Sequence, residues 1–237
     1  MPGGNVIMAG DRVVKSYPAA ADAQAAQDRA RALIRQGTAT PEAFRDSEKT
    51  ISFQMLAGQS GTALLDELGA LLSPLPALHA ASLPLPPHDP FRRILPRLAL
   101  APDALRERIA ALRTPTKPGP CHPVHGDFHP GQVIRTTDGK VWLIDLDDMA
   151  AGTVADDLGN LIAWLATAPA ARDRMAPAVW RDAVLRAWQG GRIAPQDLAK
   201  TTEIALIRRA LKRAATGDLQ PIARLMSGGY ADLLSGG

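Results

Sequence analysis

One segment of this chain limits the fold more than any other. Residues 132–145 read QVIRTTDGKVWLID. Two runs with the apolar and polar alternation of β-strands lie on either side of Asp138 and Gly139. An Asp-Gly pair tolerates the positive φ angles of a tight turn, so the segment predicts a β-hairpin. The two ends of a hairpin lie side by side, at roughly the 5 Å spacing of paired strands. We therefore expect Asp127, before the hairpin, and Asp145, at its end, to be brought near each other.

The loop before this hairpin is crowded with titratable side chains. Residues 124–133 read VHGDFHPGQV, which suits a metal site, a catalytic loop or a polar turn. A loop acid, an amide and a second acid after a returning strand can divide the work of magnesium-assisted phosphoryl transfer. In that interpretation Asp127 orients or deprotonates a hydroxyl acceptor, while Gln132 and Asp145 hold Mg²⁺.

The chain divides into two parts of different character. Before Gly58, the sequence predicts a hairpin over 5–8 and 12–17, a helix over 19–36 and a strand within 50–56. After it, apolar periodicity predicts helices over 62–72, 102–113, 157–166, 178–189 and 195–215. Residues 73–90 are rich in proline and predict a loop that carries at most short helical pieces. We expect an α+β fold, with residues 1–57 as a small β-containing lobe and 58–237 as a larger, mainly helical lobe.

Composition excludes several classes of protein. Hydrophobic residues at 46% and charged residues at 22% are ordinary for a globular protein, which argues against disorder. The net charge of +3 is small, and no basic stripe is interleaved with aromatics, so we expect no nucleic-acid partner. The longest apolar stretches are short or broken by proline and no signal peptide is recognisable, which predicts no membrane association. With a single cysteine, Cys121, a cytoplasmic location is expected.

Three motifs resemble those of the aminoglycoside phosphotransferase and choline-kinase-like group, which shares the protein-kinase fold. They are HGDFHPGQ at 125–132, LIDLDD at 143–148 and GTVADDLGNL at 152–161, in matching order and spacing. Weaker similarity lies in VVKSY at 13–17, FQMLAG at 53–58 and ALHA at 77–80. The resemblance covers most of the chain and implies a protein-kinase-like fold of two lobes, with nucleotide binding in residues 1–57 and the catalytic loop and metal site in 58–237.

The resemblance also assigns roles within the central motifs. Asp127 takes the position of the catalytic aspartate, and His125 supports its loop. Asp145 and Gln132 take the positions of the ligands for Mg²⁺, although the family usually has asparagine where this chain has Gln132. Asp157 is expected to brace the larger lobe by capping a helix that begins there.

Nucleotide binding is implied for the first part of the chain. Lys15 resembles the strand lysine that contacts the phosphates of ATP, and the backbone of Met55 and Leu56 would bind adenine. Only fourteen residues precede Lys15, so we expect the first strand of the usual sheet to be missing, with PGGN at 2–5 as a remnant of the glycine-rich loop. No acid in the first helix has a convincing spacing to pair with Lys15.

These observations predict an ATP-dependent small-molecule kinase that phosphorylates a hydroxyl of a small metabolite or an aminoglycoside-like acceptor. Residues 117–160 hold three basic and seven acidic residues, which suits Mg²⁺ first and would also suit a cationic acceptor. Two alternatives stay open. The short amino end and Gln132 suit a non-catalytic kinase-like protein that binds a nucleotide or a partner, whereas clustered His122, His125, Asp127 and His129 suit a zinc hydrolase. The oligomeric state does not follow from the sequence.

Overall fold

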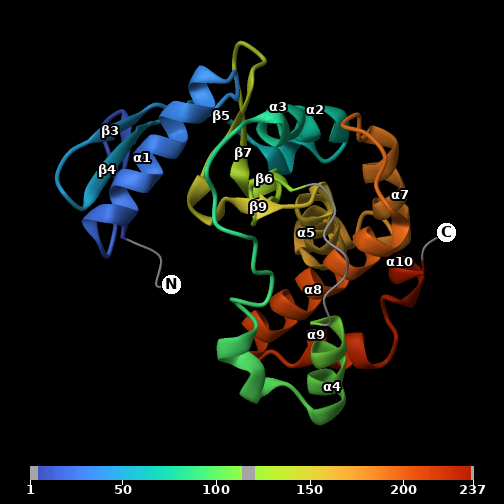
Figure 1. The fold of residues 1–237 in the computed structure, drawn as a ribbon. Coiled ribbons are helices and arrows are strands. Elements are labelled where there is room, and N and C mark those ends of the chain that lie inside the picture. The colour runs from blue at the N-terminus through green and yellow to red at the C-terminus, as the bar shows by residue number, and fades with distance from the viewer. Residues whose placement is uncertain (1–4, 114–120, 236–237) are drawn as a thin grey trace. The chain divides into compact units, whose positions relative to one another are not determined.

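The computed structural model describes residues 5–113 and 121–235, and it forms two compact units (Figure 1). Residues 1–85 and 130–149 make up the first unit, and residues 86–129 and 150–237 make up the second. From the sequence we predict a nucleotide-binding lobe over residues 1–57 and a helical lobe over residues 58–237. That division by function stays a prediction. Most of PGGN, residues 2–4, lies outside the described residues.

The first unit begins with a four-stranded antiparallel sheet in the order β1-β2-β4-β3. Its strands are β1 (Val6–Ala9), β2 (Arg12–Ser16), β3 (Ala43–Arg45) and β4 (Thr50–Gln54). Helix α1 (Ala20–Arg35) lies against β3 and β4, and its small Ala23, Ala26 and Ala30 let it approach the sheet closely around Ile51 (Figure 1). The predicted hairpin, helix and strand are confirmed, and this packing places Lys15 on an inner strand of the sheet.

A second, three-stranded sheet of the first unit contains the predicted hairpin. Its strands are β5 (Gly58–Ser60), β7 (Val133–Thr136) and β8 (Val141–Leu143), in the order β5-β7-β8. Gly139 has a φ of +82°, and its N–H donates to the carbonyl of Thr136 at 2.9 Å. The Asp138 carboxylate accepts hydrogen bonds from the Thr136 hydroxyl at 2.5 Å and the Lys140 N–H at 3.2 Å. The hairpin is confirmed, with the Asp-Gly pair at its turn.

The continuous helix predicted over residues 62–72 is wrong. The structure has a 3-10 turn, η1 (Gly61–Leu64), followed by the short helices α2 (Leu68–Leu72) and α3 (Leu75–Ala80). Glu67 breaks the run, because its φ of −124° and ψ of 54° are not helical. The proline-rich segment that follows starts with α3, so it carries the short helical piece that its composition allowed.

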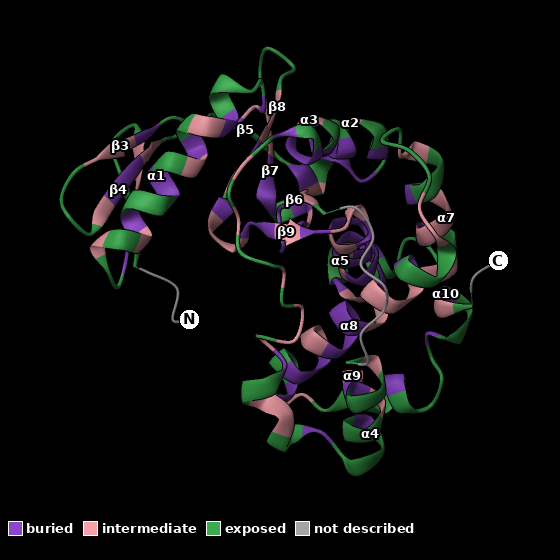
Figure 2. Ribbon diagram, in the orientation of Figure 1, coloured by how far each residue is buried: buried purple, intermediate pink, exposed green. Residues whose placement is uncertain are grey.

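The second unit is mainly helical. Its helices are α4 (Asp103–Leu112), α5 (Val154–Thr167), α6 (Pro169–Arg172), α7 (Pro177–Ala187), α8 (Pro195–Ala214), α9 (Gln220–Met226) and α10 (Ala231–Leu234), with a 3-10 turn, η2 (Leu95–Leu100). Strand β6 (His122–Val124) pairs with β9 (Ala150–Gly152). Figure 2 shows α5 buried over most of its length, in line with the many apolar residues of its sequence.

Helices α5 and α8 pack very closely. A Cβ added at Gly159 of α5 would lie 2.5 Å from the Thr201 hydroxyl and 2.8 Å from the Thr202 nitrogen, both on α8. Only glycine fits this crossing without displacing backbone. The close contact fixes the positions of the polar side chains that α5 and α8 carry, among them Asn160 and Arg208.

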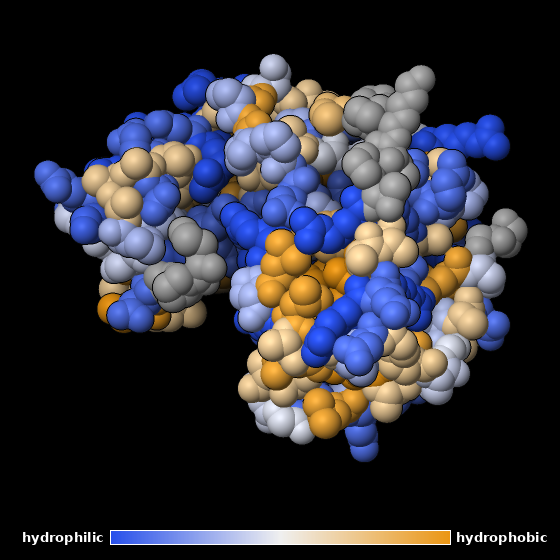
Figure 3. All heavy atoms as spheres, turned by 60° about the horizontal axis from the view of Figure 1, so that its bottom comes forward, coloured by the Kyte–Doolittle hydropathy of each residue, from blue (hydrophilic) through white to orange (hydrophobic). Residues whose placement is uncertain are grey.

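Several large apolar residues are exposed at the surface, and Val6, Ile7 and Met8 of β1 are neighbours in sequence. Figure 3 shows hydrophobic residues in several places on the face that it draws, with hydrophilic residues between them. Exposed large hydrophobic residues include Leu95 and Leu100 of η2 and Val179 of α7. Single exposed side chains of this kind are common on proteins. Within residues 5–113 and 121–235, none of the helices is long and apolar enough to cross a membrane.

Candidate active site

Side chains of helix α5 hold the loop that carries Asp127 through hydrogen bonds. Gly126 has a φ of +77°, a conformation that glycine adopts without strain. The fully buried Asp157 carboxylate accepts the N–H of His125 at 2.9 Å and that of Gly126 at 3.0 Å. Asn160, one turn further along α5, donates its side-chain amide to the Gly126 carbonyl at 3.2 Å. Three hydrogen bonds from one helix therefore set the path of the loop backbone.

The helix-cap role predicted for Asp157 is wrong. Helix α5 begins at Val154, three residues earlier than predicted, and Thr153 is its N-cap residue. The cap is closed by Asp156, whose carboxylate accepts the backbone N–H of Thr153 at 2.7 Å and its hydroxyl at 3.0 Å. Asp157 therefore binds the loop and not the end of its own helix. His125 is fully buried, with its ring edge against Phe128 at 6.1 Å between centroids, and its supporting role stays a prediction.

Replacing Asp157 by asparagine is expected to destabilise the protein. The amide nitrogen of asparagine would face a backbone N–H in place of an accepting oxygen, and a buried donor without an acceptor costs about 1–3 kcal/mol. The expected result is a lower denaturant midpoint with an unchanged slope. The matched control is Asp103→Asn, at a side chain that is 91% exposed in its ion pair with Arg106, where we expect almost no change. Equal midpoints for the two variants would contradict the role of Asp157.

The carboxylate of Asp127 is bound by two arginines. Arg208 Nη2 donates to Oδ1 at 2.7 Å, and Arg93 Nη1 donates to Oδ2 at 2.8 Å. Burial raises the pKa of Asp127, but the nearby guanidinium groups of Arg208 and Arg93 outweigh burial and hold the pKa below its ordinary 3.8. Asp127 is therefore ionised at neutral pH. Each carboxylate oxygen has a second lone pair, so the group can also accept a hydrogen bond from a hydroxyl.

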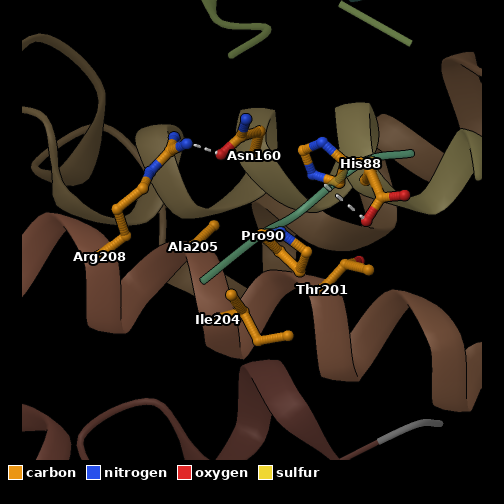
Figure 4. Close-up of a pocket in the computed structure, with 8 residues that line it drawn as sticks. His88, Pro90, Asn160, Thr201, Ile204, Ala205 and Arg208 are labelled. Atoms are coloured by element: carbon orange, nitrogen blue, oxygen red, sulfur yellow. Dashed lines mark hydrogen bonds and ion pairs between the residues drawn. The ribbon is translucent and has the colours of Figure 1, made fainter. Parts of the chain in front are cut away.

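Asn160 and Arg208 line a small hollow in the second unit, beside Asp127. Arg208 Nη2 also donates to Asn160 Oδ1 at 2.6 Å, so one guanidinium group binds both the aspartate and the helix that holds the loop (Figure 4). The hollow is open to solvent and has a volume of about 20 Å³, close to what one water molecule needs. Its lining residues come from the segment before η2 and from helices α5 and α8: His88, Pro90, Asp156, Asn160, Thr201, Ile204, Ala205 and Arg208.

His129, at the end of the loop, is held neutral. Its ring stacks on Trp164 of α5, with 6.3 Å between centroids and 10° between planes. Burial lowers the pKa of His129 to about 4, from an ordinary value of 6.5; the Asp127 carboxylate opposes this shift, and Arg209 adds to it. The imidazole therefore carries no charge at neutral pH and serves as a flat apolar surface against Trp164.

This neutral histidine predicts a pH dependence of stability. Between about pH 6.5 and about 4 the unfolded chain binds a proton at His129 that the folded chain excludes, so acidification through this window favours unfolding. At 1.36 kcal/mol per pKa unit the loss reaches about 3 kcal/mol at the acid end. We expect His129→Phe, which keeps the ring but cannot titrate, to remove this part of the loss. The loss is measured as the difference between the unfolding free energies at about pH 7.5 and about pH 4.5. An equal loss in the variant and the wild type would contradict the lowered pKa of His129.

The predicted metal ligands and the predicted nucleotide lysine meet in the first unit. Asp145 follows β8 and has a φ of 57° and a ψ of 61°, the left-handed region, as the one non-glycine residue with positive φ in the described part of the chain. Lys15 Nζ lies 2.6 Å from Asp145 Oδ1. The Gln132 amide nitrogen lies 3.4 Å from Asp145 Oδ2. Backbone conformations of this kind are often kept where function requires them.

Lys15 has two acidic partners that sequence reasoning missed. Besides Asp145, its Nζ lies 2.5 Å from Asp147 Oδ2, and Tyr17 donates its hydroxyl to Asp147 Oδ1 at 3.0 Å. Burial lowers the pKa of Lys15, but Asp147 and Asp145 outweigh burial and leave the pKa above its ordinary 10.5. Burial and the Asp147 charge likewise raise the pKa of Tyr17. The lysine is charged and the tyrosine neutral at physiological pH.

The segment assigned to adenine is already hydrogen-bonded in part. Met55 follows β4, and its N–H donates to the Asp11 carbonyl at 2.9 Å. The Met55 side chain is exposed, and Leu56 is half-buried. The Met55 N–H could bind adenine only after its hydrogen bond to the Asp11 carbonyl is broken. The nucleotide-binding roles of Met55 and Leu56 stay predictions.

The side chains proposed for a zinc site are used in other ways. Over the described residues, no three histidine, cysteine, aspartate or glutamate side chains are grouped so that they could hold a metal ion. His125 packs on Phe128, His129 stacks on Trp164, and Asp127 binds arginines. This arrangement does not favour the zinc hydrolase alternative.

A small antiparallel sheet with one helix, a helical unit and an aspartate loop whose backbone is bonded to a buried helix are the features expected from the motif resemblance. Residues 7–203 match the sequence model of the phosphotransferase enzyme family, abbreviated APH, and the chain belongs to this family. A comparison with curated proteins gave no match. The family resemblance expected from the sequence is confirmed.

Solved structures show the same fold at low identity. A choline/ethanolamine kinase family protein from Mesorhizobium loti is 18% identical, with a TM-score of 0.67 over 98% of this chain and 88% of that one. An aminoglycoside-3'-phosphotransferase of type VIII is 18% identical, with a TM-score of 0.63 over 88% and 94%. A choline kinase from Streptococcus pneumoniae is 13% identical, with a TM-score of 0.65 over 96% and 89%. The predicted kinase-like α+β fold is confirmed.

Proposed function

We propose that this protein is an ATP-dependent small-molecule kinase that transfers the γ-phosphate to a hydroxyl of a small metabolite or an aminoglycoside-like acceptor, with Mg²⁺ as a cofactor. The observation that carries the proposal is the meeting of Lys15, Gln132 and Asp145 in the first unit. These residues were selected from the sequence as phosphate and metal contacts, and they converge although Lys15 and Asp145 are 130 positions apart.

The residues present fit a magnesium ion. Mg²⁺ prefers oxygen ligands and is usually held by one or two carboxylates together with water and substrate phosphates. The Asp145 carboxylate is 46% exposed, and the Gln132 side chain beside it supplies an amide oxygen once that amide is turned. Asp145 and Gln132 would hold the ion, which would neutralise charge on the phosphates of ATP. Lys15 would exchange one acidic partner for a phosphate oxygen and keep Asp147 as the other.

The remaining roles fall to the loop in the second unit. Asp127, ionised at neutral pH, would accept the hydrogen bond of the acceptor hydroxyl and take its proton as phosphate transfer proceeds. The backbone clamp by Asp157 and Asn160 would keep Asp127 at a fixed position during transfer. Several structural relatives support a nucleotide, because their solved complexes contain AMP in a choline kinase and ADP with streptomycin in an aminoglycoside phosphotransferase.

The proposal is tested by binding and turnover together. ATP is titrated by calorimetry with and without Mg²⁺, and ADP release is then followed with a panel of sugars, amino alcohols and aminoglycosides. We expect Mg²⁺ to tighten ATP binding and at least one acceptor to stimulate ADP release. Tight binding of ATP without ADP release across the whole panel would favour the non-catalytic alternative, and no binding of ATP would remove the proposal.

A further inference from the structure

Positive charge gathers around Asp127. Its carboxylate is paired with both Arg93 and Arg208. A third guanidinium group, that of Arg209, interacts electrostatically with Asp127 and donates from Nε to the Thr167 hydroxyl at 2.7 Å. Burial and the neighbouring Arg208 lower the pKa of Arg209 to about 10, so it stays charged at neutral pH. Arg93 and Arg208 thus bind the Asp127 carboxylate directly, and Arg209 adds positive charge nearby.

Asp156 is the acid among the residues that line the hollow. Asp156 closes the N-cap of α5 through Thr153, and His88 Nε2 lies 3.9 Å from its other carboxylate oxygen. The Thr201 hydroxyl likewise donates to the Ala155 carbonyl at 2.7 Å. Figure 4 shows Arg208 at one end of the hollow, directed toward Asn160, and His88 at the other. The charged group of the hollow that contacts Asp127 is the Arg208 guanidinium.

We propose that the acceptor carries an anionic group, a carboxylate or a phosphate, which binds to Arg208 in this hollow and draws it away from Asp127. The inference rests on the proposed function and narrows its acceptor to an anionic hydroxy compound. It also replaces the cationic acceptor that the acidity of residues 117–160 suggested, because six of the seven acids in that segment already contact Lys15, backbone N–H groups or the arginines.

Arg208 has the geometry for such an exchange. In the structure both oxygens of Asp127 are in contact with a guanidinium group, so an arriving hydroxyl competes with arginine for the carboxylate. A planar guanidinium binds a carboxylate or a phosphate through two parallel hydrogen bonds. An anionic group on the acceptor would satisfy Arg208 while freeing Oδ1 of Asp127 for the hydroxyl. A cationic acceptor would be repelled by Arg208, which would stay paired with Asp127.

The test measures binding without ATP, so that it does not depend on turnover. The probes share a three-carbon hydroxylated skeleton and differ in charge: glycerate and glycerol phosphate are anionic, glyceramide and glycerol neutral, and serinol cationic. Each is titrated by calorimetry into wild type and into Arg208→Gln and Arg208→Lys. Arg213→Gln is the matched control, because Arg213 lies on the same helix, pairs with Asp218 and is 47% exposed. Unfolding midpoints establish that each variant is folded.

We expect an anionic probe to bind wild type and Arg213→Gln at least tenfold more tightly than the neutral and cationic probes. Arg208→Gln should lose that preference, and Arg208→Lys, which keeps charge but not the planar fork, should keep only part of it. Serinol binding as tightly as the anions, an undiminished preference in Arg208→Gln, or no binding of either anion would overturn the inference. The proposed function fails on different grounds, when no acceptor of any charge stimulates ADP release.

Discussion

The Asp127→Asn variant is expected to turn over about 10²-fold to 10⁴-fold more slowly than wild type, the usual contribution of a positioned general base. Asparagine cannot take the proton of the acceptor hydroxyl, and its amide nitrogen would face one of the two guanidinium groups that now bind the carboxylate. The residues assigned to ATP, Lys15 and the segment at Met55, belong to the first unit and are unchanged. Nucleotide affinity should therefore stay close to that of wild type.

The measurement combines steady-state ADP release with calorimetric titration of ATP and Mg²⁺ into the same preparation. Asp173→Asn serves as the control, because it removes the same charge from an ion pair with Arg172 at a side chain that is 74% exposed. That variant should match wild type in both assays. Turnover of Asp127→Asn within a few-fold of wild type would contradict the role of Asp127, provided that an unfolding curve shows the variant to be folded.

Asp145→Asn is expected to weaken the binding of magnesium-nucleotide by about tenfold or more, since the site loses a charged oxygen ligand. Asparagine is the informative replacement because it tolerates the left-handed backbone that Asp145 adopts at a φ of 57°. Lys15 keeps Asp147 as a partner, so the sheet around it should stay in place. Binding of ATP without Mg²⁺ should be unchanged or slightly tighter, because a negative charge near the phosphates is removed.

The quantity to measure is the ratio of ATP affinities with and without Mg²⁺. Gln132→Asn is the companion variant: it keeps an amide oxygen and restores the residue usual in the family, so the ratio should be preserved or increased. An Asp145→Asn protein with the wild-type ratio would show that Asp145 does not hold the metal. Equal losses in both variants would show instead that any change in this segment disturbs the site.

Local patterns predicted the elements that position the site. The turn at Asp138 and Gly139 and the alternation on either side of it specify the hairpin within fourteen residues, and the structure has it at that position. The helix over 19–36 and the strand within 50–56 follow equally from near neighbours in sequence. Fold class followed from the order and spacing of the three central motifs, which were specific enough to indicate the family.

The predictions from sequence failed where the local pattern was weak or where the interacting residues are distant in sequence. The start of α5 was placed at Asp157 because Thr153 and Asp156 form a capping box with aspartate in place of the usual glutamate or glutamine. Asn160 could have been found, since it lies three residues after Asp157 and thus on the same face of the helix.

No local pattern indicates that arginines bind Asp127. Arg93 and Arg208 lie 34 and 81 positions away from it, and only tertiary packing brings them to the carboxylate. The same holds for Lys15 and its acidic partners, which are separated by more than half of the chain. The charge around a functional group is therefore the property that a single sequence predicts least well, and it is the property on which the proposed anionic acceptor rests.

The account is tested most directly by following the γ-phosphate itself. Wild-type protein is loaded with Mg²⁺ and γ-labelled ATP, mixed with the acceptor panel including the anionic hydroxy compounds, and the products are separated after a single turnover. We predict that label moves to a hydroxyl of one acceptor class in step with the ADP formed, and that it stays on ATP when Asp127 is asparagine. Label that appears only as free phosphate, or that reaches an acceptor equally well without Asp127, would contradict the account.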